Sequence, residues 1–270
     1  MKKTEIRLNQ FITDIYIDSF LNKAYKPLEN CEGFIKNNSE IVIFKPEAIN
    51  NYLDKFDIIK LYDLSLDAIN QIKVLFGLDN RKKVRQIILE FQPDYFNYTG
   101  SKFKKLKKAM RKYESLITEI VDAPRSFADF DLFIQNWKKN RKKAHHIMTT
   151  GVDKNFVNTQ LSKHGNRLIS KIFYIGEQLV GFSIIEIVAE GIYNNLFCKI
   201  DTNFSQLNLF IDSYMFELVF KATSAGFIMN MGSDNGKKSL LKYKTTTFPT
   251  PVHIFERYEA RILNHNINKI

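Results

Sequence analysis

Cysteine is scarce in this sequence, and its two cysteines, Cys31 and Cys198, stand far apart. Two thiols cannot form the disulfide framework of a small secreted protein, and without neighbouring ligands they cannot form a structural zinc site. Histidine is also sparse, and the adjacent pair His145 and His146 would point to different sides of a helix. We therefore expect no metal site and a reducing, cytoplasmic environment.

Long apolar runs are missing as well. A membrane-spanning helix needs roughly 18 consecutive apolar residues, whereas the longest candidate, Gly181 to Val188, has the length of a strand and contains Glu186. The first residues are basic but no apolar stretch follows them, so we expect no signal peptide. No serine or cysteine stands in a nucleophile motif such as GxSxG. The 270 residues, 44% of them hydrophobic, predict about two globular domains.

The positive charge of the chain is concentrated in two segments. Lysine and arginine number 40 against 29 acidic residues, which gives a net charge of +11. Seven of the basic residues lie within Lys102 to Lys112 and five within Lys138 to Lys143. Without these twelve, the remaining 28 basic residues nearly balance the acidic ones. The two segments therefore dominate the positive field of the protein.

Both basic segments have helical periodicity. In the first, apolar residues recur every three or four positions from Phe103 to Tyr113. The second closes a helical pattern that begins near Phe127, where the helix dipole favours cations. Lysine faces of this kind are often only solvated, and the alternative is an anionic partner, with nucleic acid phosphates and anionic lipid head groups both suitable. The candidate anion-binding residues are Lys102, Lys104, Lys105, Lys107, Lys108, Arg111, Lys138, Lys139 and Arg141.

The second half of the chain has the clearer pattern of secondary structure. Glycine-containing turns separate runs of β-branched and aromatic residues, and an amphipathic stretch ends at Gly226. The expected strands are Arg167–Tyr174, Leu179–Val188, Ile192–Ile200, Phe227–Met231 and Val252–Tyr258, and the expected helices are Gln206–Ala225 and Lys237–Lys244.

The first half has weaker signals of mixed type. We expect strands at Ser39–Phe44 and Val84–Phe91 and helices at Ala48–Phe56 and Leu66–Leu75. The pattern breaks at Gln92–Gly100, before the first basic segment. Helices and strands thus alternate irregularly along the chain, which predicts an α/β (α+β) fold.

The sequence of Met229 to Pro249 resembles a motif of the GNAT acyltransferase superfamily, and more narrowly of the C-terminal domain of phosphatidylglycerol lysyltransferases and their soluble relatives. The resemblance covers roughly Tyr98 to Ala260. The matching positions are Asn230, Asp234, Gly236, Lys244 and Pro249 in that motif, Glu186 and Lys199 on two expected strands, and Gly100, Lys102 and Phe103 at the start of the first basic segment. Lys107, Lys108 and Arg111 depart from the family, whose relatives have an Arg and two Asn there.

The resemblance implies two tandem GNAT-like domains, each a mixed twisted sheet flanked by helices. Residues 1–97 would form the first module, residues 98–165 the basic helices and their connection, and residues 166–270 the catalytic module. In such a fold two central strands splay apart, and the carbonyl of the donor lies in the gap, where backbone donors can stabilise an oxyanion.

The implied activity is transfer of an acyl or aminoacyl group to an amine or hydroxyl. Acid/base candidates are Glu186, Asp201, Asp234 and Tyr243, although Glu186 would also suit an outward strand position and Tyr243 a packed helix position. Candidate donor-binding residues are Lys199, Asn230, Gly236, Lys242 and Lys244.

The stretch Asp201–Phe210 holds no glycine, where enzymes that use acetyl-CoA usually present a glycine-rich pyrophosphate loop. This absence favours aminoacyl-tRNA over acyl-CoA as the donor. An acyl-CoA-dependent N-acyltransferase and a non-catalytic module that binds RNA or a membrane surface remain the alternatives.

Overall fold

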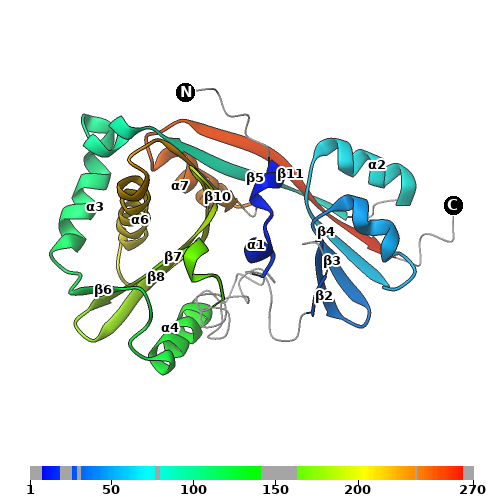
Figure 1. The fold of residues 1–270 in the computed structure, drawn as a ribbon, viewed down its shortest axis with the longest axis horizontal. Coiled ribbons are helices and arrows are strands. Elements are labelled where there is room, and N and C mark those ends of the chain that lie inside the picture. Colours follow the sequence, from blue (N-terminus) through cyan, green and yellow to red (C-terminus); the bar gives the residue numbers. More distant parts are fainter. Residues whose placement is uncertain are drawn as a thin grey trace.

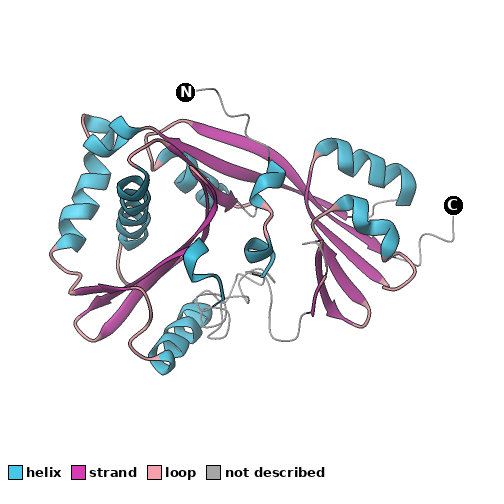
Figure 2. Cartoon of the chain, in the orientation of Figure 1, coloured by secondary structure: helices cyan, strands magenta, loops and turns pink. Residues whose placement is uncertain are grey.

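The computed structural model of the chain describes residues 8–18, 26–28, 32–76, 80–140, 163–234 and 236–263. Within them the fold is α+β, as predicted, with one mixed sheet and helices on its faces (Figures 1 and 2). The strands are β1 (Lys26–Pro27), β2 (Gly33–Asn37), β3 (Glu40–Ile43), β4 (Ile58–Leu64), β5 (Asn80–Phe91), β6 (Glu119–Val121), β7 (Leu168–Ile175), β8 (Gln178–Ala189), β9 (Ile192–Ile200), β10 (Phe227–Ser233) and β11 (Val252–Leu263). The helices are α1 (Asp14–Asp18), α2 (Leu66–Phe76), α3 (Lys104–Glu114), α4 (Phe127–Asn140), α6 (Leu207–Thr223) and α7 (Lys238–Thr246).

A single sheet runs through the described residues, in the strand order β1-β2-β3-β4-β11-β5-β10-β9-β8-β7-β6. The last strand of the chain, β11, lies between β4 and β5 and is antiparallel to both. The long pair β5 and β11 therefore joins β1–β4 and α2 to the larger group that holds β6–β10 (Figure 1). Two tandem modules remain a prediction.

The order of elements expected for the second half is confirmed, since each expected strand and helix overlaps one in the structure. The last strand extends beyond Tyr258 to Leu263, because pairing with β4 continues there. In the first half, the expected strands and the helix at Leu66–Leu75 are confirmed. The helix expected at Ala48–Phe56 is wrong: the chain forms a 3-10 helix at Pro46–Asn51, with a proline at its start and two turn-favouring asparagines at its end.

The strands β7 to β10 are covered on both faces, so their side chains divide between two cores. On one face, Phe173 and Met229 pack in a cluster with residues of α3 and α6, such as Phe210. On the other face, Phe182 packs with Phe130 of α4 and Ile15 of α1. None of the described helices is both long and apolar enough to cross a membrane.

Phe91 ends β5 at the centre of the larger core. Its ring centroid lies 4.9 Å from that of Phe216 in α6, 4.9 Å from that of Phe227 in β10 and 4.8 Å from that of Tyr95. The side chain is fully buried. It therefore connects α6 to the neighbouring strands β5 and β10.

We expect Phe91→Ala to lower the free energy of unfolding by about 3–5 kcal/mol, because it leaves a cavity among aromatic rings. Urea denaturation followed by circular dichroism measures this change. Leu132→Ala is the control, since Leu132 is 56% exposed and should lose little stability. A loss below about 1 kcal/mol for Phe91→Ala would contradict the central place of this ring.

Candidate active site

The strands β9 and β10 are parallel neighbours that pair over part of their length. Their register runs from Ile192 opposite Ile228 to Asn194 opposite Asn230. β9 continues to Ile200 and β10 to Ser233, with no further pairing between these described residues. Their pairing therefore ends at Asn194 and Asn230, and we call the region between residues 195–200 and 231–233 the seam. This end of pairing agrees with the splay of two central strands that the resemblance implies.

The bend that carries β10 away from β9 is stabilised by side chains. The backbone N–H of Gly232 donates to Asn230 Oδ1 at 2.9 Å, and Gly232 has a φ of 71°, which suits glycine. The register with β5 shifts between Asn230 and Ser233. Lys244 Nζ donates to the carbonyl oxygens of Met231 and, at 2.9 Å, of Ser233. The bent strand thus has polar partners outside the β9 ladder.

Asp212 of α6 and Tyr243 of α7 form a polar pair beside the seam. The Tyr243 hydroxyl donates to Asp212 Oδ2 at 2.7 Å, and the side-chain amide of Asn195 donates to Oδ1 at 3.3 Å. The Cys198 thiol is another hydrogen-bond partner of Asp212. Asn195 and Cys198 are both seam residues of β9. Asn195 Oδ1 is buried without a hydrogen-bond partner among the described residues, which leaves an acceptor here.

Burial changes the proton affinities of these groups. It raises the pKa of the Asp212 carboxyl, against the opposing hydrogen bonds of Tyr243, Cys198 and Asn195. Burial and the charge of Asp212 raise the pKa of Tyr243 well above its ordinary value, so this hydroxyl stays protonated at neutral pH. Burial lowers the pKa of Lys244 to about 8, although Asp212 and Asp234 oppose the change. The site thus combines a protonated phenol, a buried carboxyl and an amine whose pKa is lowered to about 8.

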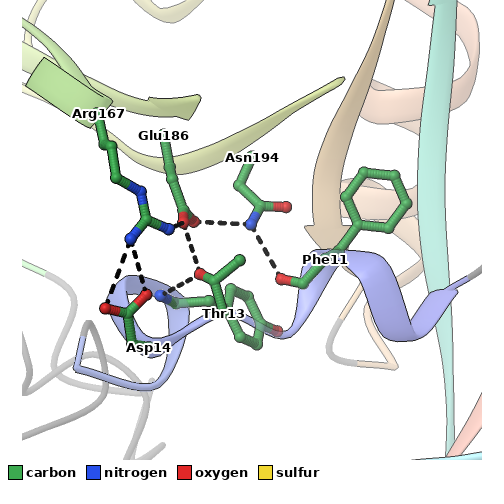
Figure 3. A network of polar contacts seen from close by, with 7 residues as sticks. Phe11, Thr13, Asp14, Arg167, Glu186 and Asn194 are labelled. Atoms are coloured by element: carbon green, nitrogen blue, oxygen red, sulfur yellow. Dashed lines mark hydrogen bonds and ion pairs between the residues drawn. The ribbon is translucent and has the colours of Figure 1, made fainter. Parts of the chain in front are cut away.

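The predicted residues Glu186 and Asn230 lie on the opposite face of the sheet from Asp212. Glu186 is fully buried, so an outward strand position is wrong, and it sits among residues of the N-terminal segment (Figure 3). Thr13 Oγ1 donates to its Oε1 at 2.6 Å, and Arg167 lies 3.2 Å from the same oxygen. Asn194 donates to Oε2 at 2.8 Å. Burial raises the pKa of the Glu186 carboxyl, and the Thr13 and Asn194 hydrogen bonds oppose this change.

Asp234 and Gly236 lie in the loop between β10 and α7. Asp234 is fully buried, and its Oδ1 accepts the backbone N–H groups of Arg85 at 3.0 Å and Gly236 at 2.9 Å. Its Oδ2 lies 3.0 Å from Nε of Arg85. These contacts fix the loop to β5. Lys242, another predicted donor-binding residue, is exposed on α7.

Two other predicted residues of β9 and the loop that follows lie toward α4. Lys199 Nζ sits over the ring of Trp137, 4.3 Å from its centroid. Asp201 lines a pocket of about 420 Å³ with Asp129, Trp137 and Glu177, and it accepts a hydrogen bond from Gln178 at 3.0 Å. The structure therefore brings Tyr243 and Lys244 together at the seam but places Asp201 in a separate pocket.

The first basic segment forms the 3-10 turn Ser101–Phe103 and helix α3, which packs on α6. All its predicted anion-binding residues are exposed except Lys107, which is half-buried. At its end, the Tyr113 hydroxyl donates to the carbonyl of Ser205 at 2.6 Å, in the loop after β9. In the second segment Lys139 is exposed on α4; Arg141 lies outside the described residues, as does the side chain of Lys138.

Comparison with known proteins gives a likeness of fold. No family model matches the sequence, and no curated protein matches it. A solved structure of the C-terminal domain of a protein described as a lysylphosphatidylglycerol synthetase from Agrobacterium fabrum aligns with 11% identity and a TM-score of 0.59, covering 88% of this chain and 83% of that one. L-PGS from Bacillus licheniformis aligns with 12% identity and a TM-score of 0.55, covering 91% and 85%. FemX aligns with 10% identity and a TM-score of 0.53, covering 91% and 85%.

The chain has a GNAT-like fold. This confirms the resemblance inferred from the motifs around Asn230 and Lys244. The seam between β9 and β10 corresponds to the splay of central strands that the family resemblance implies. At these levels of identity the similarity concerns the fold alone.

Sequence reasoning missed Asp212, Asn194 and Asn195 as residues of the candidate site. Asp212 had a usable signal, because it stands within a helical stretch whose other residues are mostly apolar. Asn194 and Asn195 had none, since two asparagines in a strand could equally mark an exposed face. Their roles depend on the partners that the sheet brings beside them.

Lys244 should titrate with a midpoint near pH 8 rather than at its ordinary value of 10.5. The folded protein binds the proton of the Lys244 ammonium less tightly than the unfolded chain does. The contribution of Lys244 to the free energy of unfolding should therefore rise with pH between about 8 and 10.5. NMR of ¹³C-labelled lysine, with Lys244→Met for assignment, measures the midpoint. The stability of the wild type relative to Lys244→Met should increase over the same range. A midpoint above pH 10 would be inconsistent with a desolvated amine.

Proposed function

We propose that this protein is a cytoplasmic acyltransferase that transfers an aminoacyl group from aminoacyl-tRNA to an amine or hydroxyl acceptor. The observation that carries the proposal is the open seam with Asp212 and Tyr243 beside it. A closed sheet would leave no space between β9 and β10 for a donor carbonyl. Asn195 Oδ1, which has no partner among the described residues, adds an acceptor for a polar group of the ligand.

The polar pair suits acyl transfer. In the proposed reaction, the acceptor atom attacks the ester carbonyl carbon, and Asp212 takes the proton that the acceptor loses. Backbone groups of β9 beyond Asn194 stabilise the oxyanion. When the bond between this carbon and the ribose oxygen breaks, Tyr243 protonates the leaving oxygen. The proton on Asp212 then passes to Tyr243 along their 2.7 Å hydrogen bond, which restores both groups.

The position of α3 supports a polyanionic donor. Its C-terminal end meets Ser205 through Tyr113, and the ammonium of Lys112 lies 4.7 Å from the ring centroid of Tyr113. The exposed lysines of α3 thus lead to the loop that follows the seam strand β9. This loop has no glycine to admit a pyrophosphate, which favours tRNA over coenzyme A. We keep Lys199, Lys242 and Lys244 as proposed donor-binding residues.

The name of one similar structure also supports an aminoacyl group as the group that is transferred. That structure is described as a lysylphosphatidylglycerol synthetase, a name that specifies a lysyl group joined to a phospholipid. We also propose the tandem GNAT-like organisation, with modules at 1–97 and 166–270, because β5 and β11 join two groups of strands.

Tyr243→Phe and Asp212→Asn should each slow transfer about 100-fold or more, because they remove the proton donor and the proton acceptor. The assay follows the loss of radiolabelled amino acid from charged tRNA, with cell extract as the source of acceptor. Tyr214→Phe is the matched control, since Tyr214 is a half-buried tyrosine of α6 that packs against Phe173. Equal rates for Tyr243→Phe and wild type would remove Tyr243 from the mechanism.

If the wild type transfers nothing from charged tRNA but coenzyme A raises its melting temperature, an acyl-CoA-dependent N-acyltransferase replaces the proposal. If it binds tRNA or anionic vesicles without turnover of either donor, the protein is a binding module of GNAT-like shape. Each outcome points to a different class of function.

Reversing the charge of the α3 lysines should weaken tRNA binding strongly and reduce its dependence on salt. The variant changes Lys104, Lys105, Lys107 and Lys108 to Glu. Each lost phosphate contact should lower the slope of log affinity against log salt by roughly 0.7–0.9. Filter binding at several salt concentrations measures this slope, and anionic vesicles provide the parallel assay for a lipid partner.

The matched control reverses four basic residues far from α3 in sequence, namely Lys26, Lys55, Lys73 and Lys83, which are exposed. This control has the same net charge as the α3 variant. Similar loss in both variants would show that overall charge, rather than α3, binds the nucleic acid.

A further inference from the structure

A chain of buried side-chain hydrogen bonds crosses four neighbouring strands at the point where the seam begins. Gln86 of β5 donates to Asn230 of β10 at 2.5 Å, and Asn230 donates to Asn194 of β9 at 2.9 Å. Asn194 donates in turn to Glu186 of β8 at 2.8 Å. All four side chains are at most 4% exposed. Asn194 and Asn230 are also the last paired residues of β9 and β10.

The N-terminal segment closes this chain of hydrogen bonds. Thr13 donates to Glu186, and the carbonyl of Phe11 accepts a second hydrogen bond from Asn194 at 2.9 Å (Figure 3). Arg167 bridges Glu186 and Asp14, at 3.2 and 3.1 Å. Both oxygens of Glu186 therefore have partners, and residues 11–14 are fixed over the sheet on the face opposite Asp212.

Glu186 sets the direction of every amide in the chain. Glu186 accepts hydrogen bonds at both carboxyl oxygens, so the amide nitrogen of Asn194 faces it and Oδ1 of Asn194 faces Asn230. The amide nitrogen of Asn230 then faces Asn194, which leaves its Oδ1 for the backbone N–H of Gly232. That last hydrogen bond stabilises the bend of β10. The orientation fixed at β8 thus reaches the wall of the seam.

We propose that Glu186, Asn194 and Asn230 are positioning residues that hold the seam open, and that residues 11–14 belong to the donor site through them. The inference rests on the proposed function for the identity of the donor, but the coupling to Gly232 is a property of the fold. It assigns Glu186 an indirect role, because its oxygens are occupied by Thr13, Arg167 and Asn194.

The direct test is hydrogen exchange of the Gly232 amide, measured by NMR in full-length protein. Glu186→Gln replaces an acceptor with a group that can also donate, so the amide of Asn194 loses its fixed partner. We expect the Gly232 amide to exchange about 3- to 10-fold faster in this variant, although residue 186 lies on β8. Glu190→Gln makes the same chemical change at an exposed position near the end of β8 and should leave the exchange unchanged.

Thr13→Val is the milder variant if Glu186→Gln does not fold, since it removes one hydrogen bond to Glu186 and keeps that of Arg167. It should shift the Gly232 exchange in the same direction. Unchanged exchange at Gly232 in both variants, or equal acceleration throughout the sheet, would overturn the inference.

Donor binding provides the second readout, with an amide-linked aminoacyl RNA minihelix as the probe. Glu186→Gln and Asn230→Asp should each weaken binding of the minihelix about 2- to 30-fold. The double variant should bind no more weakly than the single variant with the larger loss of affinity, because both changes break the same chain of hydrogen bonds. If the two losses of affinity multiply in the double variant, the residues act independently, which would contradict a coupled chain of hydrogen bonds.

The two readouts separate the inference from the proposed function. If the wild type does not bind the minihelix but Glu186→Gln still speeds exchange at Gly232, the aminoacyl donor is refuted and the positioning role is retained. If the wild type binds the minihelix but exchange at Gly232 does not change, the positioning role is refuted and the aminoacyl donor is retained.

Discussion

The separation of two parallel strands at Asn194 and Asn230 is the constraint on which the rest of the structure depends. A parallel pair that parts inside a sheet exposes backbone groups that need new partners. Lys244 binds two carbonyl groups of the bent β10, and Asn230 binds the N–H of Gly232. These two side chains therefore satisfy backbone groups of β10 that the β9 ladder does not.

The seam has different chemistry on its two faces. On the α6 face, Asp212, Tyr243 and Lys244 combine a buried carboxyl, a protonated phenol and an amine of lowered pKa. On the other face, Glu186 and Asn194 are saturated with hydrogen bonds. Titratable groups with shifted pKa values thus stand on one face, and a hydrogen-bonded polar scaffold stands on the other.

Much of this fold could be predicted from sequence, because the strands and helices of the second half have regular periods and glycine-containing turns. Strand β5 was predicted from Val84 but begins at Asn80, since Lys82 and Lys83 pair with glutamates of β11 that are distant in sequence. Of the residues predicted for the candidate site, the structure places Tyr243 and Lys244 beside the seam and Asp201 in a separate pocket. The apolar neighbours of Asp212 in α6 marked it as a buried acid, but its partners Tyr243 and Asn195 are distant in sequence. The same holds for Asn194, whose partner Asn230 lies on another strand.

The most direct test of the central claim is a crystal structure with an amide-linked aminoacyl-adenosine, the non-hydrolysable end of a charged tRNA. The account predicts the aminoacyl carbonyl between residues 195–200 and 231–233, with the Tyr243 hydroxyl within hydrogen-bond distance of the amide nitrogen that replaces the ribose oxygen. A ligand bound elsewhere, with β9 and β10 paired beyond Asn194 and Asn230, would contradict it.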